Sequence, residues 1–191
     1  MRVLVVDESE ERGEILREGL ARAGHEVTAS LTSAIALLKT IDELQPDVIV
    51  IDTDSPSRDT LEHLVAVSQH GPRPVVMFAN DGAPETIREA VRAGVSAYVV
   101  DGLDAGRIRT IIDVAVARFE DFQRLRAELA AANLKLSDRK VIDQAKGVLM
   151  KTRGLDEEAA YAFLRKAAMD RKLKLAEVAQ RLVDAADLLG A

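Results

Sequence analysis

Residues 141–154 read VIDQAKGVLMKTRG, and the C-terminal third of the chain is organised around this stretch. Its apolar side chains recur at helical spacing, which predicts a helix with one inward-facing stripe made of Ile142, Ala145, Leu149 and Thr152. Gly147 lies inside that helix, where glycine costs about 1 kcal/mol relative to alanine. We therefore expect another backbone or a ligand to approach Gly147 closely. Gly154 is expected to end the helix in a left-handed conformation.

Two shorter helices are predicted to follow and to share a small core with the first. Acidic residues 156–158 suit the positive N-terminal end of the second helix. The third helix has an apolar stripe made of Leu175, Val178, Ala179, Leu182 and Val183. Residues 137–191 are therefore expected to form an all-α three-helix domain. A plain bundle without a ligand remains the alternative interpretation.

The sequence of this region is more specific than a bundle requires. It reads AKGxLM from Ala145, AxxxLRxxAM from Ala160 and LAEVA from Leu175. Over about residues 136–188 it resembles the ANTAR domain of RNA-binding transcription antiterminators of the AmiR and NasR type. Lys146 has no role in the predicted core and stands beside Gly147, where its cation could meet a phosphate or a base edge. The resemblance implies that this bundle binds RNA stem-loops.

Further RNA-binding candidates are basic and aromatic side chains of the same predicted domain. They are Lys140, Lys151, Tyr161, Arg165, Lys166, Arg171 and Lys172. Lys140 and Lys151 lie six and five residues from Lys146, so at about 3.6 residues per turn they do not share its helix face. We expect Lys146 to act with cations from another helix, and Tyr161 to offer a stacking surface. Phe163 could stack as well, but it is expected in the core.

Composition limits the classes of function. The 191 residues have room for one full domain and a small one. The absence of cysteine excludes disulfides and thiolate metal sites, and three scattered histidines do not favour a zinc centre. The sequence shows no signal peptide and no apolar run of about 18 residues, so we expect a cytoplasmic protein without membrane contact.

The net charge of −6 is unevenly distributed. Residues 139–174 hold ten Lys or Arg and five Asp or Glu, which gives this segment +5 and leaves −11 for the remainder. A basic end on an acidic carrier favours a nucleic-acid-binding output domain. Solvated helix faces would produce the same asymmetry, so charge by itself leaves both interpretations open.

Residues 1–118 alternate short apolar runs with helical periodicity. Strands are predicted at residues 2–6, 25–30, 47–51, 74–78 and 97–100, with helices at 10–23, 32–44, 59–68 and 84–93. The alternation predicts an α/β, flavodoxin-like domain, which is a five-stranded parallel sheet with helices on both faces. Residues that follow the strands gather at the carboxyl edge of such a sheet. In this chain they include Asp7, Glu8 and Asp52.

These acidic residues resemble the site of two-component receiver domains. The resemblance implies that Asp52 is the phospho-acceptor and that it holds Mg²⁺ together with Asp7 and Glu8. The carbonyl of Asp54 would complete the protein ligands, since Mg²⁺ prefers oxygen donors. Pro56 matches a proline that the family often has in this loop. The alternative is that acidic residues at strand ends are merely solvated.

Two positions depart from the receiver pattern. The family places Ser or Thr at the end of the fourth strand, where this chain has Ala79, and Lys after the fifth strand, where it has Asp101. An anion in place of the cation repels a phosphoryl group, whose charge is about −1.5 to −2. The receiver is therefore expected to be degenerate and controlled by a binding partner. The resemblance implies a ligand-sensing regulatory protein as that partner.

Helical periodicity continues from Asp104 well beyond the predicted sheet. Apolar residues at steps of three and four predict a coiled-coil helix over residues 119–136, with a seam made of Phe122, Leu125, Leu129, Ala132 and Leu136. We expect this seam to pair two copies in a parallel homodimer, and a helix lying on its own domain is the alternative. Ser137 could begin a separate helix, or one helix could run through Leu136 into the bundle.

The combined resemblance is to NasT-like regulators of nitrate assimilation. It implies an RNA-binding transcription antiterminator that binds stem-loops in a nascent leader transcript and keeps an intrinsic terminator from forming. No enzyme is expected, because no nucleophile–base pair or phosphate-binding glycine loop accompanies the acidic residues. A phosphorylation-dependent DNA-binding response regulator is the alternative. DNA is disfavoured because the bundle lacks a short-turn recognition helix rich in polar base readers.

Overall fold

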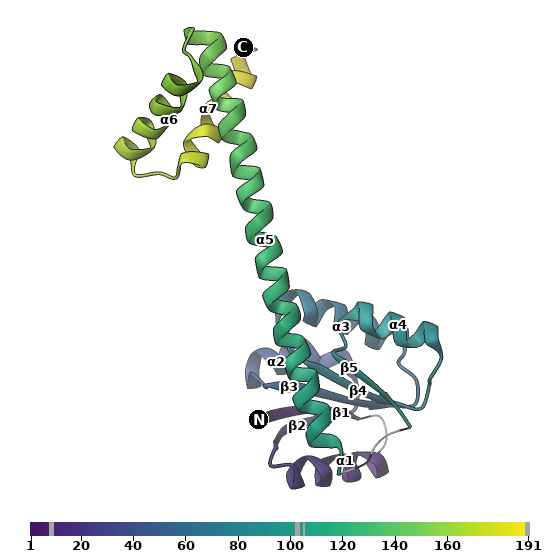
Figure 1. The fold of residues 1–191 in the computed structure, drawn as a ribbon. Coiled ribbons are helices and arrows are strands. Elements are labelled where there is room, and N and C mark those ends of the chain that lie inside the picture. The colour runs from purple at the N-terminus through teal and green to yellow at the C-terminus, as the bar shows by residue number, and fades with distance from the viewer. Residues whose placement is uncertain (8–9, 102–103, 105, 190–191) are drawn as a thin grey trace. The chain divides into compact units, whose positions relative to one another are not determined.

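The computed structural model describes residues 1–7, 10–101, 104 and 106–189 (Figure 1). The chain forms two compact units, Met1–Gln123 and Arg124–Ala191, called here the N-terminal and C-terminal units. Within the described residues, no helix is both long and apolar enough to cross a membrane. Glu8, one of the predicted metal ligands, lies outside the described residues.

The N-terminal unit contains a parallel sheet with strand order β2-β1-β3-β4-β5, which confirms the predicted α/β fold. The strands are β1 (Arg2–Asp7), β2 (Glu26–Leu31), β3 (Val48–Thr53), β4 (Val75–Ala79) and β5 (Ala97–Val100). The connecting helices are α1 (Glu10–Arg22), the short 3₁₀ turn η1 (Ala34–Ala36), α2 (Leu37–Leu44), α3 (Arg58–His70) and α4 (Pro84–Ala93). Most of these bounds lie close to the predicted ranges because the apolar periodicity changes clearly between strand and helix. The helix predicted over residues 32–44 is shorter than expected, because residues 34–36 form a 3₁₀ turn and α2 begins at Leu37.

Successive strand residues point to opposite faces of the sheet and so build two separate cores. Leu4 and Ile49 belong to one core with side chains of α2, α3 and α4. Val3 and Val48 belong to the other core with side chains of α1 and the first turns of α5 (Ile108–Arg153). These four strand side chains have no exposed surface. Burial of apolar area, at about 25 cal/mol per Å², stabilises the sheet between its two helix layers.

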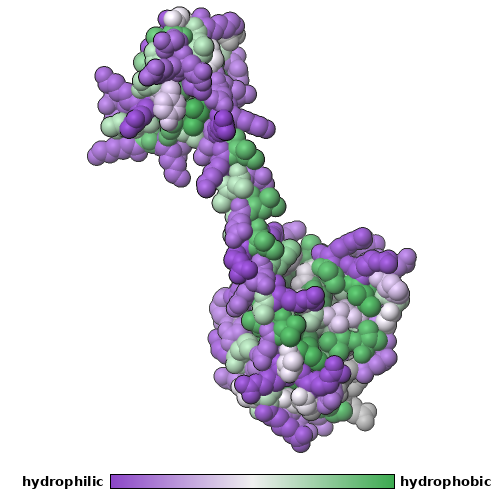
Figure 2. All heavy atoms as spheres, viewed as in Figure 1, coloured by the Kyte–Doolittle hydropathy of each residue, from purple (hydrophilic) through white to green (hydrophobic). Residues whose placement is uncertain are grey.

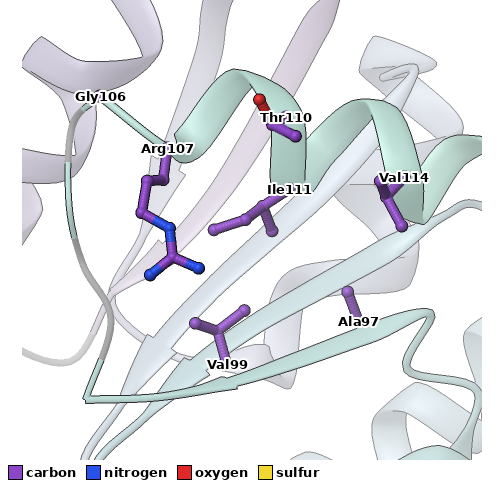
Figure 3. Close-up of a pocket in the computed structure, with 7 residues that line it drawn as sticks. All are labelled: Ala97, Val99, Gly106, Arg107, Thr110, Ile111 and Val114. Carbon is purple, nitrogen blue, oxygen red and sulfur yellow. The ribbon is translucent and has the colours of Figure 1, made fainter.

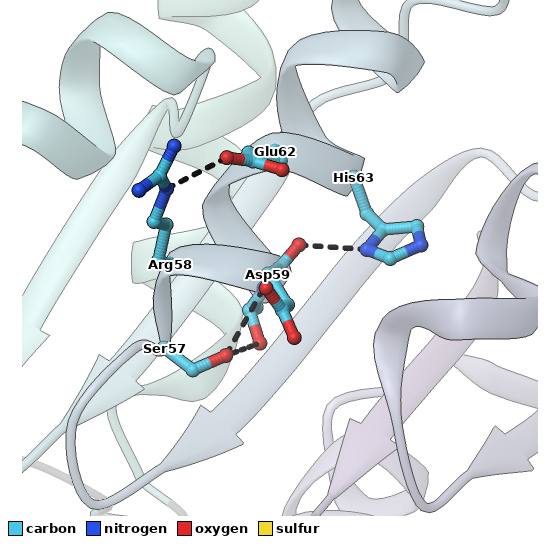
Figure 4. Close-up of polar contacts among 6 residues, drawn as sticks. Ser57, Arg58, Asp59, Glu62 and His63 are labelled. Carbon is cyan, nitrogen blue, oxygen red and sulfur yellow. Dashed lines mark hydrogen bonds and ion pairs between the residues drawn. The ribbon is translucent and has the colours of Figure 1, made fainter.

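Side-chain contacts fix the start of α3 (Figure 4). Ser57 Oγ accepts a hydrogen bond from the Thr60 backbone N–H at 3.1 Å, which satisfies one of the unpaired donors of the first turn. Asp59 lies in the same turn, where the positive end of the helix favours an acid. Arg58 Nε donates to Glu62 Oε1 at 2.8 Å. These contacts therefore fix the first turn of α3 immediately after the loop that carries Asp54.

One helix, α5, contains 46 residues and contributes to both units. Ile108 and Ile112 are fully buried in the second core of the N-terminal unit. The helix continues unbroken through Leu136 and Ser137, so the alternative of a separate helix beginning at Ser137 is wrong.

The predicted seam residues on α5 are exposed. The exposed fraction is 57–62% for Phe122, Leu125, Leu129 and Leu136, and Ala132 is exposed as well. None of these five residues belongs to the apolar clusters formed by the described residues. Figure 2 shows apolar surface along this part of the helix. The helix thus carries exposed apolar side chains that belong to none of the three apolar clusters.

The C-terminal unit is the expected arrangement of three helices. The last turns of α5 pack with α6 (Glu157–Arg171) and α7 (Leu175–Leu189). Their shared core consists of Ala145, Leu149, Ala160, Leu164, Ala168, Val178 and Ala179. Asp156 caps α6, because its Oδ1 accepts the Ala159 backbone N–H at 2.7 Å. Gly154 has φ of 64°, which confirms the left-handed end predicted for α5.

One residue of the predicted stripe on α5 is wrong, and one of the two causes expected for Gly147 is not found in the described chain. Thr152 does not face the core but is exposed, and its hydroxyl donates to the Val148 carbonyl at 2.7 Å. Gly147 is not approached by another backbone of the described chain, because a Cβ atom at this position would meet nothing within 4 Å. The approach of a ligand to Gly147 stays a prediction.

Candidate nucleic-acid interface

Lys146 is the centre of a small ionic cluster in the C-terminal unit. Its Nζ donates to Asp143 Oδ1 at 2.7 Å and to Glu157 Oε1 at 2.8 Å. The Lys146 side chain is 15% exposed, whereas the Glu157 side chain is 72% exposed. Hydrogen bonds to Asp143 and then to Glu157 raise the pKa of Lys146, because both carboxylates favour the charged amine. The expectation that the bundle has no use for Lys146 is therefore wrong, since this residue joins α5 to the first turn of α6.

A pocket of about 370 Å³ lies around this cluster, within the C-terminal unit. It is lined by Arg139, Asp143, Lys146, Gly147, Met150 and Glu157. All except Glu157 come from α5. The hydrogen bond with Lys146 and the attraction of nearby cations hold the pKa of Asp143 below its usual range. The lining therefore contains two cations and two carboxylates, with the bare backbone of Gly147 beside them.

The other predicted RNA-binding side chains lie elsewhere on the C-terminal unit. Lys140, Lys151, Tyr161, Arg165, Lys166, Arg171 and Lys172 are all exposed, and none of them lines the pocket. The residue that joins Lys146 from another helix is the acid Glu157 rather than a cation. The seven side chains remain candidates for contacts with a nucleic-acid backbone outside the pocket.

Phe163 does not lie in the core, contrary to expectation. Its side chain is 39% exposed, and the Arg153 guanidinium lies 4.7 Å from the centre of its ring. Such a cation–π contact contributes about 0.5–1 kcal/mol at an exposed site. Tyr161 is 44% exposed, in agreement with its expected availability for stacking.

Several pocket residues were missed from the sequence. Asp143 precedes Lys146 by three residues on one helix, and that spacing is a signal for a local ion pair. Glu157 follows Lys146 by eleven residues, and their contact requires the turn at Gly154. No periodicity rule predicts a contact across such a turn. Arg139 and Met150 were missed because each appears in the sequence as an ordinary exposed helix residue.

The carboxyl edge of the sheet in the N-terminal unit brings together two of the three predicted acidic residues. Asp7 and Asp52 are partners in the register of β1 and β3, and they are 7% and 1% exposed. The Asp7 carboxylate lies where the Cβ atom of any larger residue at position 13 would be, so only glycine fits there. Among the residues that the structure describes, no group of three acidic or histidine side chains could hold a metal ion.

A hydrogen-bonded clamp joins the loop after β3 to the loop after β4. The Asp54 carbonyl accepts the backbone N–H groups of Asn80 and Asp81, each at 3.0 Å. Asn80 Nδ2 donates to Asp54 Oδ1 at 2.7 Å, and Ser55 Oγ donates to Asp81 Oδ2 at 2.9 Å. Both acceptor positions of the Asp54 carbonyl are thus used within the chain. The metal-ligand role that the receiver resemblance implies for this carbonyl stays a prediction, and it would require these two hydrogen bonds to change.

Asp81 is the centre of this clamp. Its carboxylate accepts the Ala83 backbone N–H at 2.8 Å and the Thr86 hydroxyl at 2.9 Å, and its carbonyl accepts the Tyr98 hydroxyl at 2.8 Å. The hydrogen bond from Ala83, followed by those from Ser55 and Thr86, lowers the pKa of Asp81. Sequence reasoning missed Asp81 because its partners come from three separate segments.

The two departures from the receiver pattern are visible at the ends of β4 and β5. Ala79 is buried at the end of β4, and its carbonyl accepts the Asp101 backbone N–H at 3.2 Å. Asp101 is exposed and has φ of 48°, a left-handed conformation that aspartate tolerates better than most residues. Position 79 therefore presents a methyl group, and position 101 presents an acid.

A second pocket, of about 310 Å³, lies beside β5 at the edge of the sheet. Ala97 and Val99 of β5 face Ile111 and Val114 of α5, and the Arg107 side chain extends toward Val99 (Figure 3). Gly106 and Thr110 complete the lining. The pocket is mostly apolar with one cation at its side, which suits an apolar side chain of a partner better than a charged metabolite.

Comparisons with known proteins agree with this two-part organisation. The response regulator receiver domain family matches residues 3–113, and the ANTAR domain family matches residues 130–183. The chain is 26% identical over 183 residues to the transcriptional regulatory protein PdtaR of Mycobacterium tuberculosis, which covers 96% of this chain and 89% of that protein. It is 41% identical over 63 residues to the nitrate regulatory protein of Klebsiella oxytoca, which covers 33% of this chain and 16% of that protein.

Solved structures show the same fold for the N-terminal unit. The signal receiver domain of the response regulator NarL from Mycobacterium tuberculosis is 22% identical with a TM-score of 0.52, and the match covers 60% of this chain and 94% of that one. A pilus assembly-related protein from Burkholderia pseudomallei is 23% identical with a TM-score of 0.56, covering 62% of this chain and 90% of that one. At this level of identity the likeness concerns the fold.

Proposed function

Because this chain belongs to the response regulator receiver family and also carries an ANTAR domain, we propose that it is an RNA-binding transcription antiterminator. Its C-terminal unit would bind stem-loops in a nascent leader transcript and prevent an intrinsic terminator from forming. The observation that carries this proposal is the ANTAR match over residues 130–183. The exposed basic side chains of the same unit support it, because phosphate contacts supply much of the affinity for RNA.

The proposal includes a homodimer formed along α5. Phe122, Leu125, Leu129 and Leu136 are each more than half exposed, and they recur with the three-and-four spacing of a coiled-coil seam. A second copy of this helix would remove these side chains from water. Two bundles held in one dimer would then bind two stem-loops of one transcript, and tethering would raise the affinity for the pair.

We further propose that the N-terminal unit is controlled by a partner protein rather than by phosphorylation. Ala79 and Asp101 offer no hydroxyl and no cation to an acyl phosphate on Asp52. Asp7 and Asp52 lie at neighbouring strand ends, and with Glu8 they would hold Mg²⁺ through oxygen ligands. As the family resemblance implies, the controlling partner would be a ligand-sensing regulatory protein, and the similarity to a nitrate regulatory protein makes nitrate assimilation the process to test.

Sequencing the RNA that copurifies with the protein tests the proposed function. The expected result is enrichment of leader transcripts that carry paired short stem-loops upstream of an intrinsic terminator. Recovery of genomic DNA fragments with no enriched transcript would instead support the alternative of a DNA-binding response regulator.

A further inference from the structure

We propose that the pocket around Lys146 binds the Watson–Crick edge of one unstacked guanine from an RNA loop. The inference rests on the RNA binding proposed above, and it adds the chemical group that the bundle recognises. It concerns the six lining residues Arg139, Asp143, Lys146, Gly147, Met150 and Glu157.

The charge balance of the pocket favours a base over a phosphate. Arg139 and Lys146 carry two positive charges, and Asp143 and Glu157 carry two negative charges. Both carboxylates lie within 2.8 Å of the Lys146 amine. A phosphate drawn to Lys146 would therefore meet two anions at close range, and like charges at such separations repel. A neutral group with both donors and acceptors meets no such repulsion.

The hydrogen-bonding groups of the pocket identify which neutral group fits. A lysine amine has three N–H donors, and the contacts with Asp143 and Glu157 use two of them. The third can donate to an acceptor in the pocket. Each carboxylate contacts Lys146 through one oxygen, Oδ1 of Asp143 and Oε1 of Glu157. A carboxylate has two oxygens and about four acceptor positions, so acceptor capacity remains beside the amine.

Guanine matches this pattern better than the other bases. Its Watson–Crick edge places the O6 acceptor next to two donors, N1–H and the N2 amino group. The pocket places one donor next to carboxylate acceptors, which is the complementary order. Uracil offers a single donor between two acceptors, while adenine and cytosine have an amino group where guanine has O6. Sequence-specific RNA recognition targets unstacked loop bases through this edge.

Gly147 and Met150 provide room and contact for a flat ring. Gly147 costs helix stability, yet no atom of the described chain, apart from its own helix backbone and its two neighbours, lies within 4 Å of the place where its Cβ would be. The described fold therefore gives no reason for a glycine, and a ring lying against the helix backbone would give one. Met150 is 42% exposed at the same pocket, and its polarisable sulfur makes favourable contacts with aromatic rings.

In vitro selection from RNA hairpins with a randomised loop tests this proposal on the full chain. The wild-type protein, Glu157→Gln and Glu158→Gln each select from the same library. Glu158 is the matched control, because it lies next to Glu157 in the first turn of α6, is exposed and is absent from the pocket. We expect the wild type and Glu158→Gln to enrich guanine at one loop position. For Glu157→Gln, the enrichment of guanine at that position should be at least tenfold lower, while the variant still binds hairpins.

The possible results distinguish failure of the guanine site from failure of RNA binding. Equal guanine preference in the wild type and Glu157→Gln, or wild-type selection of loops without a fixed guanine, would overturn the guanine site while leaving RNA binding intact. If the wild type enriches no hairpin at all, the proposed function fails, and the guanine site fails with it. Replacing the selected guanine by inosine, which lacks only the N2 amino group, should weaken wild-type binding at least fivefold and Glu157→Gln binding less than twofold.

A second variant guards against a purely structural effect. Gly147→Ala should raise the melting temperature of the protein, because alanine favours the helix and meets no neighbouring atom. It should nevertheless weaken binding of the selected hairpin at least tenfold, because the added methyl group enters the pocket. Gln144→Ala, at an exposed position of α5 outside the pocket, is the control. Unchanged hairpin binding by Gly147→Ala would contradict the proposal.

Discussion

In the C-terminal unit, Asp143 and Glu157 share the amine of Lys146, whereas in the N-terminal unit Asp7 and Asp52 lie side by side at two strand ends. The receiver family has a lysine near its acidic residues, and this chain has Asp101 at that position. Carboxylates at neighbouring strand ends could supply oxygen ligands to a metal ion, whereas two carboxylates that share one amine favour a neutral polar group. The same residue type therefore indicates opposite chemistry in the two units.

The seam residues from Leu125 onward and the pocket lie along one face of α5 within the C-terminal unit. Leu136, Asp143 and Met150 are spaced by seven residues, which is about two helical turns, so they line up along the helix. The three positions that would continue the seam after Leu136 are taken by the charged residues Arg139, Asp143 and Lys146. Charged side chains oppose close apolar pairing. We therefore expect the paired part of the helix to end near Leu136 and the pocket to stay open.

The largest expected effect comes from Leu129→Glu in this seam. A charge in a desolvated helix pair is costly, so the variant should sediment as a monomer. Its affinity for two linked stem-loops should fall about 100-fold, because a monomer loses the effective concentration of the second bundle. Affinity for one stem-loop should change less than threefold. Gln123→Glu, outside the seam, is the control, and a dimeric Leu129→Glu protein would exclude the proposed pairing.

A smaller loss is expected for Lys146→Ala. This change removes the donor at the centre of the pocket and leaves Asp143 and Glu157 without their shared cation. Removing a specific base contact costs about 2 kcal/mol, the middle of the usual range, so affinity for the preferred loop should fall about 30-fold. The dependence of log affinity on log salt should stay nearly the same. A slope shallower by about 0.7–0.9 would mean that Lys146 contacts a phosphate instead.

The N-terminal unit should respond to pH through His25. Both ring nitrogens are buried without a hydrogen-bond partner among the described residues, and burial followed by the nearby N-terminal amine lowers the pKa of His25. As the pH falls through the ordinary value of about 6.5, the unfolded chain gains a proton that the folded chain resists. The free energy of unfolding should therefore decrease from about pH 7 downward until the folded pKa is reached.

Thermal melts between pH 8 and pH 5 measure this effect, which we expect to be a few degrees. His25→Gln should flatten the profile, because glutamine does not titrate. His70→Gln should keep the wild-type profile, since His70 is exposed on α3. A profile that is equally steep in His25→Gln would show that other groups are responsible.

The smallest effect is expected from phosphorylation of the N-terminal unit. Ala79 and Asp101 leave an acyl phosphate on Asp52 without a hydroxyl or a cation, and the Asp54 carbonyl is already held by Asn80 and Asp81. Treatment with a small phosphodonor and Mg²⁺ should change oligomeric state and RNA affinity less than twofold. A tenfold gain in affinity that Asp52→Asn abolishes would reverse this view of the receiver.

Much of the fold could be predicted because it depends on local periodicity. Buried strands such as Val48–Thr53 are apolar at nearly every position, and the helices repeat every three to four residues. Ala79 and Asp101 could be identified as departures because strand ends are easy to place in such a pattern. Asp7 and Asp52 could be brought together for the same reason.

The contacts that define the two sites were harder to predict because they cross turns and loops. Lys146 meets Glu157 only because α5 ends at Gly154 and α6 begins at once. Asp81 collects donors from Ser55 and Tyr98, which are far away in the sequence. Phe163 has the spacing of a core residue, yet Arg153 covers it at the surface. Each of these contacts joins side chains from different elements or loops, and periodicity within one element does not specify such contacts.

Competition between RNA and DNA for the full chain tests the central claim most directly. A labelled hairpin selected by the protein is bound at a fixed salt concentration and displaced by unlabelled hairpin or by duplex DNA with the same stem sequence. We predict that the hairpin competes at least 100-fold better than the duplex, because the proposed pocket requires an unstacked base. Equal competition by the duplex would contradict it and would leave only non-specific binding to phosphates.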